Sequence, residues 1–227
     1  MTEPVRISVI IPTWQEGRNI EGAIWSARRA GADEVIVSDG GSTDDTVSRA
    51  ERVGARVVQG AQGRGPQLNA GAAIASGQVL WFVHADARLP VRGGEEIRDA
   101  LQDPQIVGGN FRLVFGTSRT GRGIGAFYHV IRHLRMFYGD SAIFCRREAF
   151  DAVGGFPPYP IMEDLKLVHM LYRLGKLAYL KGPVVASARR WETGGEAQAW
   201  ASWFVIQGLY FAHVPPDKLA KLYRHIR

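Results

Sequence analysis

Short apolar runs alternate with helix-like segments through the first hundred residues, and this alternation constrains the fold more than any other feature. Strand-like runs cover residues 5–11, 34–38, 56–59 and 79–83, and Pro12 ends the first of them. Helix-like spacing covers residues 19–30, 44–53 and 67–76. Strands that are separated by helices form parallel sheets covered on both faces. The sequence therefore predicts an α/β fold, a Rossmann-like, mostly parallel sheet flanked by helices.

The alternation is less regular after residue 100. The pattern predicts an exposed strand over 110–115, a helix over 127–137, a strand over 141–145 and a helix over 163–174. The tail is predicted to hold a helix over 197–214 and a short last helix after Pro215 and Pro216. A chain of 227 residues is long enough for one large α/β domain. We expect one domain with a helical C-terminal extension.

Charge is distributed unevenly along the chain. Residues 1–114 hold 12 Lys and Arg against 14 Asp and Glu, a net charge of −2. Residues 115–227 hold 16 against 8, a net charge of +8, and the two halves sum to the formal +6. A basic surplus is typical of proteins that bind nucleic acid, an anionic membrane surface or a phosphorylated substrate. Because the first half is slightly acidic, we expect two halves with different roles and no nucleic acid partner.

Cysteine content and hydropathy bear on the cellular compartment. A single cysteine excludes an internal disulfide framework and is typical of a reducing compartment. Cys145 lies in an apolar stretch that predicts a buried strand residue and not a nucleophile. The first residues do not form a signal-peptide pattern. We therefore expect a cytoplasmic protein.

The segment 199–214 is the most apolar part of the chain. It is interrupted by Gln207 and His213 and is shorter than the ~20 residues that a membrane span needs. A buried core helix is one interpretation. The other is a helix at the membrane surface, anchored by aromatic side chains and followed by a basic stripe: Trp200, Trp203, Tyr210, Phe211, Lys218, Lys221, Arg224 and Arg227. Peripheral contact with the inner face of the membrane thus stays open beside a merely solvated basic face.

Acidic side chains follow three of the predicted strands at the point where each strand ends. Glu16 follows the first strand, Asp39 the second, and Asp86 lies just past the fourth. Because the carboxyl ends of parallel strands line the ligand crevice of an open sheet, we expect these three side chains to converge. Taken singly, each is also typical of a turn or a helix cap.

The segment from Asp39 to Asp45 combines a strand-end carboxylate with Gly40 and Gly41. Glycines permit a tight turn and close approach of a ligand. The Asp39 carboxylate can accept hydrogen bonds from a ribose hydroxyl or a base N–H. A capped turn alone would explain the polar residues here, but not the two glycines.

His84 and Asp86 follow the fourth strand directly. If the backbone stays extended there, their side chains point to the same side. A carboxylate at this place suits Mg²⁺ or Mn²⁺, which would neutralise a diphosphate leaving group as a Lewis acid. A capping aspartate beside a packed histidine is the alternative.

Three further motifs lie near predicted helices. Arg64, ahead of an Ala-rich helix, is a candidate phosphate contact. Glu163 and Asp164 open a helix, where acidic residues commonly complement the helix dipole, although a carboxylate fixed there could accept a proton from a hydroxyl. The run from Gly121 to Ala126 matches the dinucleotide-binding pattern, but it begins six residues past a predicted strand and so argues against NAD.

Taken together, these motifs resemble the family 2 inverting glycosyltransferases of the GT-A fold. The chain is most similar to the bacterial subgroup associated with radical-SAM/selenodomain proteins. The matching segments appear in the family's order: Ser8 to Pro12 with Glu16 and Asn19, Ser38 to Asp44, Gly63 to Gly71, His84 to Pro90, Tyr138 to Asp140, Gly154 to Pro157, Met162 to Asp164 and Ser187 to Trp191. The resemblance implies a GT-A domain over 1–192, with a donor half at 1–114 and an acceptor half at 115–192. A helical extension would cover 193–227.

The resemblance also implies roles for single residues. A nucleotide-sugar donor, a UDP-sugar in preference to a GDP-sugar, would be bound by Pro12, Glu16, Asp39, Asp44, Arg64 and Ala85. Asp86 matches the last acid of the family's D-x-D motif and would hold Mn²⁺ or Mg²⁺, and His84, which replaces the first acid, is a second candidate ligand. Asp164 matches the catalytic base. The positions expected at the diphosphate or the acceptor are Glu163, Arg190 and Trp191.

The implied reaction is a metal-dependent transfer of the sugar to an acceptor hydroxyl, with inversion of the anomeric configuration. The acceptor is not identified, and a lipid-linked or anionic acceptor would suit the basic second half. A nucleotidyltransferase on a similar sheet is the alternative, but the loop from Pro12 to Glu16 lacks the glycine and lysine that such enzymes use. A non-catalytic basic protein at a membrane surface is a third interpretation, which leaves the strand-end carboxylates without a purpose.

Overall fold

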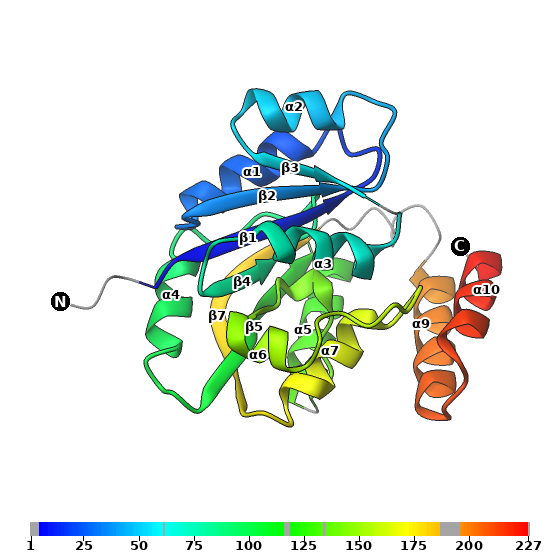
Figure 1. Ribbon diagram of the computed structural model, residues 1–227. Helices are drawn as coiled ribbons and strands as arrows, with labels where there is room; N and C mark the ends of the chain where they lie inside the picture. The colour runs from blue at the N-terminus through cyan, green and yellow to red at the C-terminus, as the bar shows by residue number, and fades with distance from the viewer. Residues whose placement is uncertain (1–4, 61, 116–118, 134, 187–195, 227) are drawn as a thin grey trace.

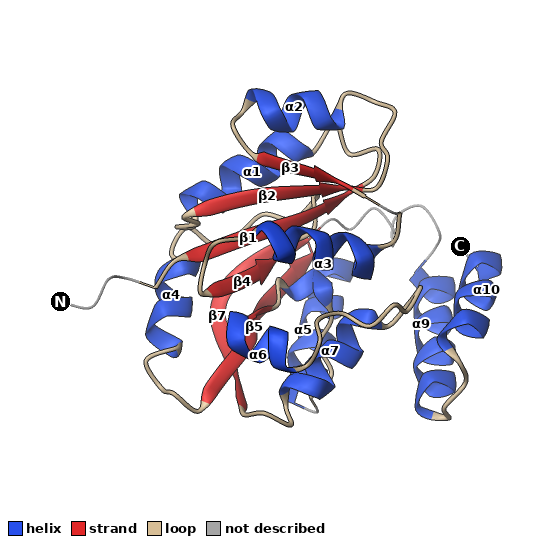
Figure 2. Ribbon diagram, in the orientation of Figure 1, coloured by secondary structure: helices blue, strands red, loops and turns tan. Residues whose placement is uncertain are grey.

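A seven-stranded sheet forms the centre of the protein (Figures 1 and 2). The computed structural model describes residues 5–60, 62–115, 119–133, 135–186 and 196–226. The strands are β1 (Ile7–Thr13), β2 (Glu34–Asp39), β3 (Arg56–Gln59), β4 (Val79–Phe82), β5 (Ile106–Phe115), β6 (Phe144–Arg146) and β7 (Lys176–Ala186). Their order across the sheet is β3-β2-β1-β4-β6-β5-β7, and β6 runs antiparallel to both of its neighbours. The predicted mixed α/β architecture with a mostly parallel sheet is confirmed.

Helices cover both faces of this sheet (Figure 2). They are α1 (Ile20–Arg29), α2 (Thr46–Arg52), α3 (Arg64–Ile74), α4 (Gly93–Ala100), α5 (Arg119–His133), α6 (Arg147–Ala152), α7 (Glu163–Leu171), α9 (Glu196–Phe211) and α10 (Pro216–Ile226). Val9 and Ile11 of β1 belong to the apolar cluster that includes α1, while Ile10 belongs to the cluster that includes α3. Successive side chains of a strand point to opposite faces, so an unbroken apolar run such as β1 is what a doubly covered strand requires.

The first strand is longer than predicted, because Pro12 does not end it. β1 continues to Thr13, and Pro12 lies opposite Ser38 of β2. Proline lacks the N–H that a central strand would donate. On its other side β1 pairs with β4 only as far as Ile10, so the missing donor costs no ladder bond to β4. β1 therefore carries the chain one residue past Pro12, to Thr13, whose hydroxyl contacts Asp39.

The second half departs further from the prediction. The strand predicted over 110–115 begins at Ile106 and is largely buried, and β7 was not predicted at all. The predicted helix over 127–137 belongs to α5, which begins earlier and ends at His133, and α7 ends at Leu171 before a turn. The glycine-rich run at 121–126 lies inside α5, not in a βα turn. Cys145 is buried in β6 as predicted, and burial raises the pKa of its thiol.

The C-terminal helices α9 and α10 lie side by side, as Figure 1 shows. Ile206 and Gln207 of α9 are buried, and the Trp203 ring lies 5.2 Å from that of Phe127 in α5. Other side chains of α9, those of Phe204, Val205 and Phe211, are largely exposed. α9 is therefore a half-buried helix. Among the described residues, no helix is both long enough and apolar enough to cross a membrane.

Candidate active site

The carboxylate of Asp39 organises the loop that follows β2. Asp39 is fully buried. Its Oδ1 accepts hydrogen bonds from the hydroxyls of Thr13 and Ser42 at 3.0 and 2.6 Å. Its Oδ2 accepts bonds from the backbone N–H groups of Gly41 and Ser42 at 2.9 and 2.8 Å. A carboxylate has about four lone-pair sites, so the loop already uses the capacity of Asp39, and a nucleoside contact must replace one of these bonds.

Gln67 of α3 ties the same loop to the sheet. Its Nε2 donates to the carbonyl oxygens of Thr13 and Ser38 at 2.7 and 2.9 Å. A Cβ atom on Gly40 would lie 3.0 Å from the Gln67 amide, which is tighter than ordinary contact, so this glycine is needed for close approach. The sequence analysis did not single out Gln67, because a glutamine inside an Ala-rich helix gives no signal of such a role.

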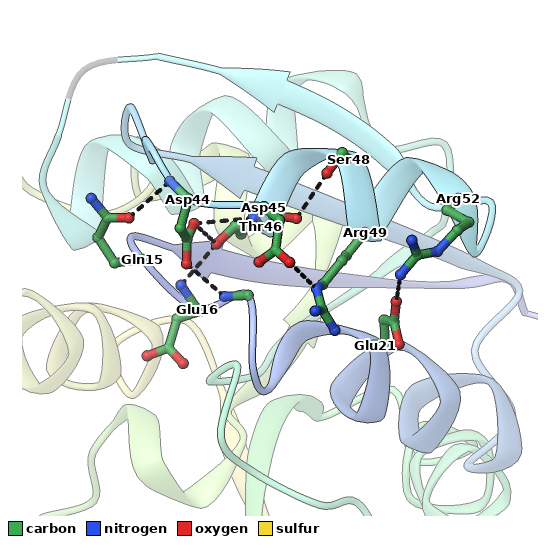
Figure 3. A network of polar contacts seen from close by, with 10 residues as sticks. Gln15, Glu16, Glu21, Asp44, Asp45, Thr46, Ser48, Arg49 and Arg52 are labelled. Atoms are coloured by element: carbon green, nitrogen blue, oxygen red, sulfur yellow. Dashed lines mark hydrogen bonds and ion pairs between the residues drawn. The ribbon is translucent and has the colours of Figure 1, made fainter.

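Asp44 connects the loop after β1 to the start of α2 (Figure 3). Its Oδ2 accepts from the N–H of Gly17 at 3.1 Å, and its Oδ1 accepts from the N–H and hydroxyl of Thr46. The Thr46 hydroxyl, the strongest influence on this carboxyl, lowers the pKa of Asp44. The Thr46 hydroxyl also accepts from the N–H of Glu16 at 2.8 Å. In this structure Asp44 therefore connects the two loops by hydrogen bonds.

Glu16 and Asp39, two of the three strand-end acids, bind different partners: Asp39 binds its own loop and Thr13 of β1. The Glu16 carboxylate accepts from Nδ2 of Asn19 at 2.6 Å, at the start of α1. Pro12 is half-buried at the end of β1, and Asp86 is half-buried beyond β4. Among the described residues, no group of three His, Cys, Asp or Glu side chains is placed to hold a metal ion. The expected convergence therefore does not produce a ready-made carboxylate cage.

The backbone from His84 to Asp86 forms a turn and is not extended. The N–H of Ala87 donates to the carbonyl of His84 at 3.1 Å, and Ala85 is buried within this turn. Because the backbone is not extended here, the prediction that the side chains of His84 and Asp86 point to the same side does not apply. β4 ends at Phe82, earlier than predicted, and this leaves the triplet free to turn.

His84 instead belongs to a polar chain that crosses a narrow pocket. Its Nδ1 lies 3.0 Å from Oδ1 of Asp140, and its Nε2 lies 3.5 Å from Nη1 of Arg64. Arg64, at the start of α3, forms an ion pair with Glu163, at the start of α7. The pocket is also lined by Gly139, Asp164, Phe82 and Phe156, and has room for about one water molecule.

Asp164 is held by backbone N–H groups in the same pocket. Gly139 donates to its Oδ2 at 2.8 Å and Leu165 donates to its Oδ1 at 2.7 Å. A Cβ on Gly139 would lie 2.9 Å from Nε2 of His84 and 3.3 Å from Oδ2 of Asp164, so only glycine fits between them without displacement. The sequence analysis assigned no role to Gly139 or Asp140.

Burial and charge act against each other at Glu163. Its side chain is 1% exposed and its Oε2 has no hydrogen-bond partner among the described residues. Burial raises the pKa of Glu163, the Arg64 charge opposes this shift, and the neighbouring Asp164 charge adds to it. The Glu163 charge in turn raises the pKa of Arg64. The pocket thus holds the Arg64 cation between the Glu163 carboxylate and the His84 ring.

The described residues fit a divalent cation that is held mainly by the phosphates of a bound ligand and only in part by the protein. Mg²⁺ in phosphate-transferring sites is commonly held by one or two carboxylates together with the phosphates of the ligand. Asp86, half-buried two residues after His84, offers such a carboxylate. A histidine that gives Nδ1 to a carboxylate offers Nε2 as a ligand, but Nε2 of His84 faces the Arg64 cation. Asp86 is therefore the better candidate of the two.

The C-terminal extension supports the loops that form this pocket. The Trp203 ring of α9 lies 6.1 Å from that of Tyr138, the residue before Gly139. Nε2 of Gln207 donates to Sδ of Met162, the residue before Glu163, at 3.7 Å. Arg190 and Trp191, which the sequence analysis placed at the diphosphate or acceptor, lie outside the described residues.

Comparisons with known proteins find consistent matches. The family model for glycosyl transferase family 2 matches residues 8–159. Glucosyl-3-phosphoglycerate synthases from Mycobacterium tuberculosis and Mycobacterium bovis are 39% identical to the chain over an alignment of 96 residues that covers 37% of the chain. That match spans 30% of the length of these curated relatives.

Solved structures extend the likeness beyond the matched segment. A structure of the M. tuberculosis synthase with Mn²⁺, UDP and glucosyl-3-phosphoglycerate has a TM-score of 0.59 and 24% identity, over 80% of this chain and 72% of that one. A mannosyltransferase from Pyrobaculum calidifontis in complex with GDP-Man and Mn²⁺ has a TM-score of 0.67 and 22% identity, over 99% of this chain and 70% of that one. At these identities the likeness shows a shared fold.

Proposed function

The chain belongs to glycosyl transferase family 2 and has the GT-A fold, and from that premise we propose that it transfers a sugar from a nucleotide diphosphate sugar to an acceptor hydroxyl. One observation carries the proposal: the Asp164 carboxylate is fixed by two backbone N–H groups in a pocket that also holds the Arg64 cation. A fixed proton acceptor beside a fixed cation is what the transfer of a sugar away from a diphosphate requires.

In the proposed reaction Asp164 takes the proton of the acceptor hydroxyl. The hydroxyl oxygen forms a bond to the anomeric carbon as the bond to the diphosphate oxygen breaks. Attack from the face opposite the diphosphate gives a product of inverted configuration. The two N–H donors fix the orientation of the carboxylate, so that little reorganisation is needed when the proton moves.

Arg64 is the residue of this pocket that we propose for the leaving diphosphate. It opens α3, where the helix dipole also favours an anion, and its partner Glu163 holds it in place. When bound, Mn²⁺ or Mg²⁺ would supply further positive charge to the diphosphate, and Asp86 would hold it, with His84 as the alternative ligand. Arg190 and Trp191 stay candidates for the diphosphate or the acceptor.

For the donor we propose a UDP-sugar. Structures of the M. tuberculosis synthase include complexes with UDP and with UDP-glucose, and the M. tuberculosis synthase is also the curated relative that is 39% identical over 96 residues. The nucleoside would lie over the ends of β1 and β2, against Pro12, Glu16 and Ala85. Asp39 would exchange one loop bond for a nucleoside bond, and Asp44 would act through the loop it braces.

For the acceptor we propose an anionic or lipid-linked molecule. The synthase structures include complexes with phosphoglyceric acid, and the second half of this chain carries the net charge of +8. α9 exposes Phe204, Val205 and Phe211, and the adjacent α10 exposes Lys218 and Lys221. Apolar and basic side chains together are complementary to an anionic bilayer surface, so we propose that this pair of helices contacts the inner face of the membrane. Co-sedimentation with anionic vesicles that is lost in Lys218→Glu/Lys221→Glu tests this contact.

The remaining details follow the sequence resemblance. We place the protein in the radical-SAM/selenodomain-associated subgroup and in the cytoplasm, with donor residues in 1–114, acceptor residues in 115–192 and a helical extension in 193–227. Because α9 packs against Tyr138 and Met162, the extension is proposed as a structural support of the catalytic domain. Deletion of 193–227 should then lower both the melting temperature and the activity.

A thermal-shift screen tests the proposed donor. UDP-, GDP- and dTDP-sugars are each added with and without Mn²⁺, because a ligand of the folded state raises the melting temperature by mass action. We expect the largest shift from a UDP-sugar with Mn²⁺, and a smaller one in Asp86→Asn. If no nucleotide sugar shifts the melting temperature with either metal condition, the proposed function is wrong.

A further inference from the structure

Arg132, near the end of α5, is a buried cation without a hydrogen-bonding partner among the described residues. The residue is 5% exposed, and its Nε has no hydrogen-bond acceptor. The charged or polar groups that influence it are two tyrosine hydroxyls, Tyr179 and Tyr172, and a second cation, Arg112. Neither an aspartate nor a glutamate of the described residues is among them. A buried guanidinium that lacks a counter-charge destabilises the folded state.

Two arginines and two tyrosines form a paired arrangement at this place. Cζ of Arg132 lies 4.8 Å from the ring centroid of Tyr179, and Cζ of Arg135 lies 5.0 Å from that of Tyr172. The two tyrosine hydroxyls are hydrogen-bonded to each other. A cation over an aromatic ring is attracted to it, most strongly when desolvated, and this attraction offsets part of the cost of burying Arg132. Both guanidiniums are thus stacked on aromatic rings, and neither is paired with a carboxylate of the residues that the structure describes.

The surroundings of the pair are open on one side and basic. Arg135 is exposed, so the arrangement reaches the protein surface. Tyr172 also lines an open groove with Arg173 and Lys176, both of which are exposed. Burial is the largest influence on Arg132 and lowers its pKa. An anion that reached the pair would meet the Arg132 and Arg135 guanidiniums, and Arg173 and Lys176 line the groove that Tyr172 shares.

We propose that Arg132 and Arg135, stacked on Tyr179 and Tyr172, form a binding site for an oxyanion, a phosphate or carboxylate group, separate from the candidate active site. Guanidinium groups bind such anions through paired hydrogen bonds. The site lies at the opposite end of α7 from Asp164, and a nine-residue helix at 1.5 Å per residue separates the two by about 13 Å. The site therefore takes an anion other than the donor diphosphate. This inference does not depend on the proposed transferase activity.

The test is a titration of the whole protein with inorganic phosphate, with chloride replaced so that ionic strength stays constant. Arginine labelled with ¹⁵N reports the Nε–H signals, and the signal missing from Arg132→Met identifies Arg132. We expect a saturable shift of this signal, and a dissociation constant that rises about tenfold or more in Arg135→Met, as the loss of a charge-assisted contact gives. In Arg64→Met, which alters the active-site pocket, the shift of the Arg132 signal should persist.

Three results would overturn the proposal. One is the absence of any saturable shift of the Arg132 signal. Another is a shift that persists in Arg135→Met but disappears in Arg64→Met, because phosphate then acts from the active site. The third is a clear loss of stability in phosphate-free buffer on Arg132→Met, since removal of an uncompensated buried charge should leave the melting temperature unchanged or higher. None of these measurements uses a nucleotide sugar. A negative result would therefore rule out the anion site without bearing on the proposed transferase function.

Discussion

The backbone N–H of Gly139 donates a hydrogen bond to Oδ2 of Asp164 at 2.8 Å. The two residues are 25 positions apart in sequence and come from the turn before β6 and from the first turn of α7. The same glycine leaves room for the ring of His84 on its other side. One small residue thus sets the distance between the proposed base and the polar chain from Asp140 to Glu163.

Gly139→Ala should impair turnover more than folding. The added Cβ would lie 2.9 Å from Nε2 of His84 and 3.3 Å from Oδ2 of Asp164, so one of these side chains must move. A displacement near 1 Å at a catalytic group costs up to about 10²-fold in rate. The matched control is Gly208→Ala in α9, where a Cβ meets open space and activity should be unchanged. Equal activities of the two variants would contradict the role given to Gly139.

Arg64→Met should destabilise the protein because it leaves the buried Glu163 carboxylate without its cationic partner. Glu163 is buried, and without Arg64 its carboxylate loses its counter-charge, a loss we expect to cost about 2–3 kcal/mol at neutral pH. The double variant Arg64→Met/Glu163→Gln should recover most of this stability, as measured by urea unfolding. Because burial raises the pKa of Glu163 in the folded state, the folded protein takes up the proton first, so the deficit of Arg64→Met should shrink as pH falls. Additive effects of the two substitutions would rule out the coupling.

Glu34 should contribute a pH-dependent part of the stability. Burial opposes ionisation of its carboxyl, but hydrogen bonds from Ser76, Ser8 and Arg56 outweigh it and lower the pKa from 4.5 to about 2. A depressed carboxyl pKa stabilises the folded state above pH 4.5, and this stabilisation is lost as pH falls toward 2. We expect a loss on the order of 2 kcal/mol over this range in the native protein and a smaller loss in Glu34→Gln. Parallel pH profiles of the two proteins would contradict this assignment.

Asp44 and its neighbour Asp45 should differ in their effect on stability. Asp44 accepts bonds from Gly17 and Thr46 and joins two loops, whereas Asp45 pairs with Arg49 one helical turn away at the surface. Asp44→Ala should cost about 1 kcal/mol, as the loss of a helix-start acceptor does. Asp45→Ala should cost only about 0.3 kcal/mol, the worth of an exposed i,i+4 pair. Denaturant midpoints of the two variants measure the difference in stability. A larger effect at Asp45 would contradict the conclusion that Asp44 connects the two loops.

The sequence predicted the first four strands well because their burial on both faces appears as unbroken apolar runs. β7 was missed because Gly182 and Pro183 interrupt its apolar residues. β5 was predicted too short because Gly108 and Gly109 are poor strand formers. In the fold both glycines are required there, since a Cβ would lie 2.5 Å from the carbonyl oxygen of Phe144 and 2.3 Å from that of Ala178. Prediction from local strand propensity thus failed at Gly108 and Gly109, where the close approach of neighbouring strands requires glycine.

Sequence patterns nominated the residues of the candidate site one by one, and their roles stay predictions, but their contacts were not predictable. Strand ends and helix starts singled out Asp39 and Arg64, whereas only the family resemblance assigned Asp164 as the base. The ion pair of Arg64 with Glu163 joins residues 99 apart in sequence, which no local pattern reveals. The full use of Asp39 by its own loop and by Thr13 of β1 was equally hidden, because the acceptor capacity of a carboxylate depends on how the chain folds around it.

The anomeric configuration of the sugar released from UDP-α-glucose in the presence of Mn²⁺ tests the central claim most directly. Proton NMR in the first minutes distinguishes the two anomers, with water as the acceptor. We predict the β-anomer from the native protein, and release that is slower by about 10²–10⁴-fold in Asp164→Asn, the range that loss of a general base gives. Release of the α-anomer, or an undiminished rate in a folded Asp164→Asn variant that still binds UDP, would contradict the assignment of Asp164 as the base of an inverting transfer.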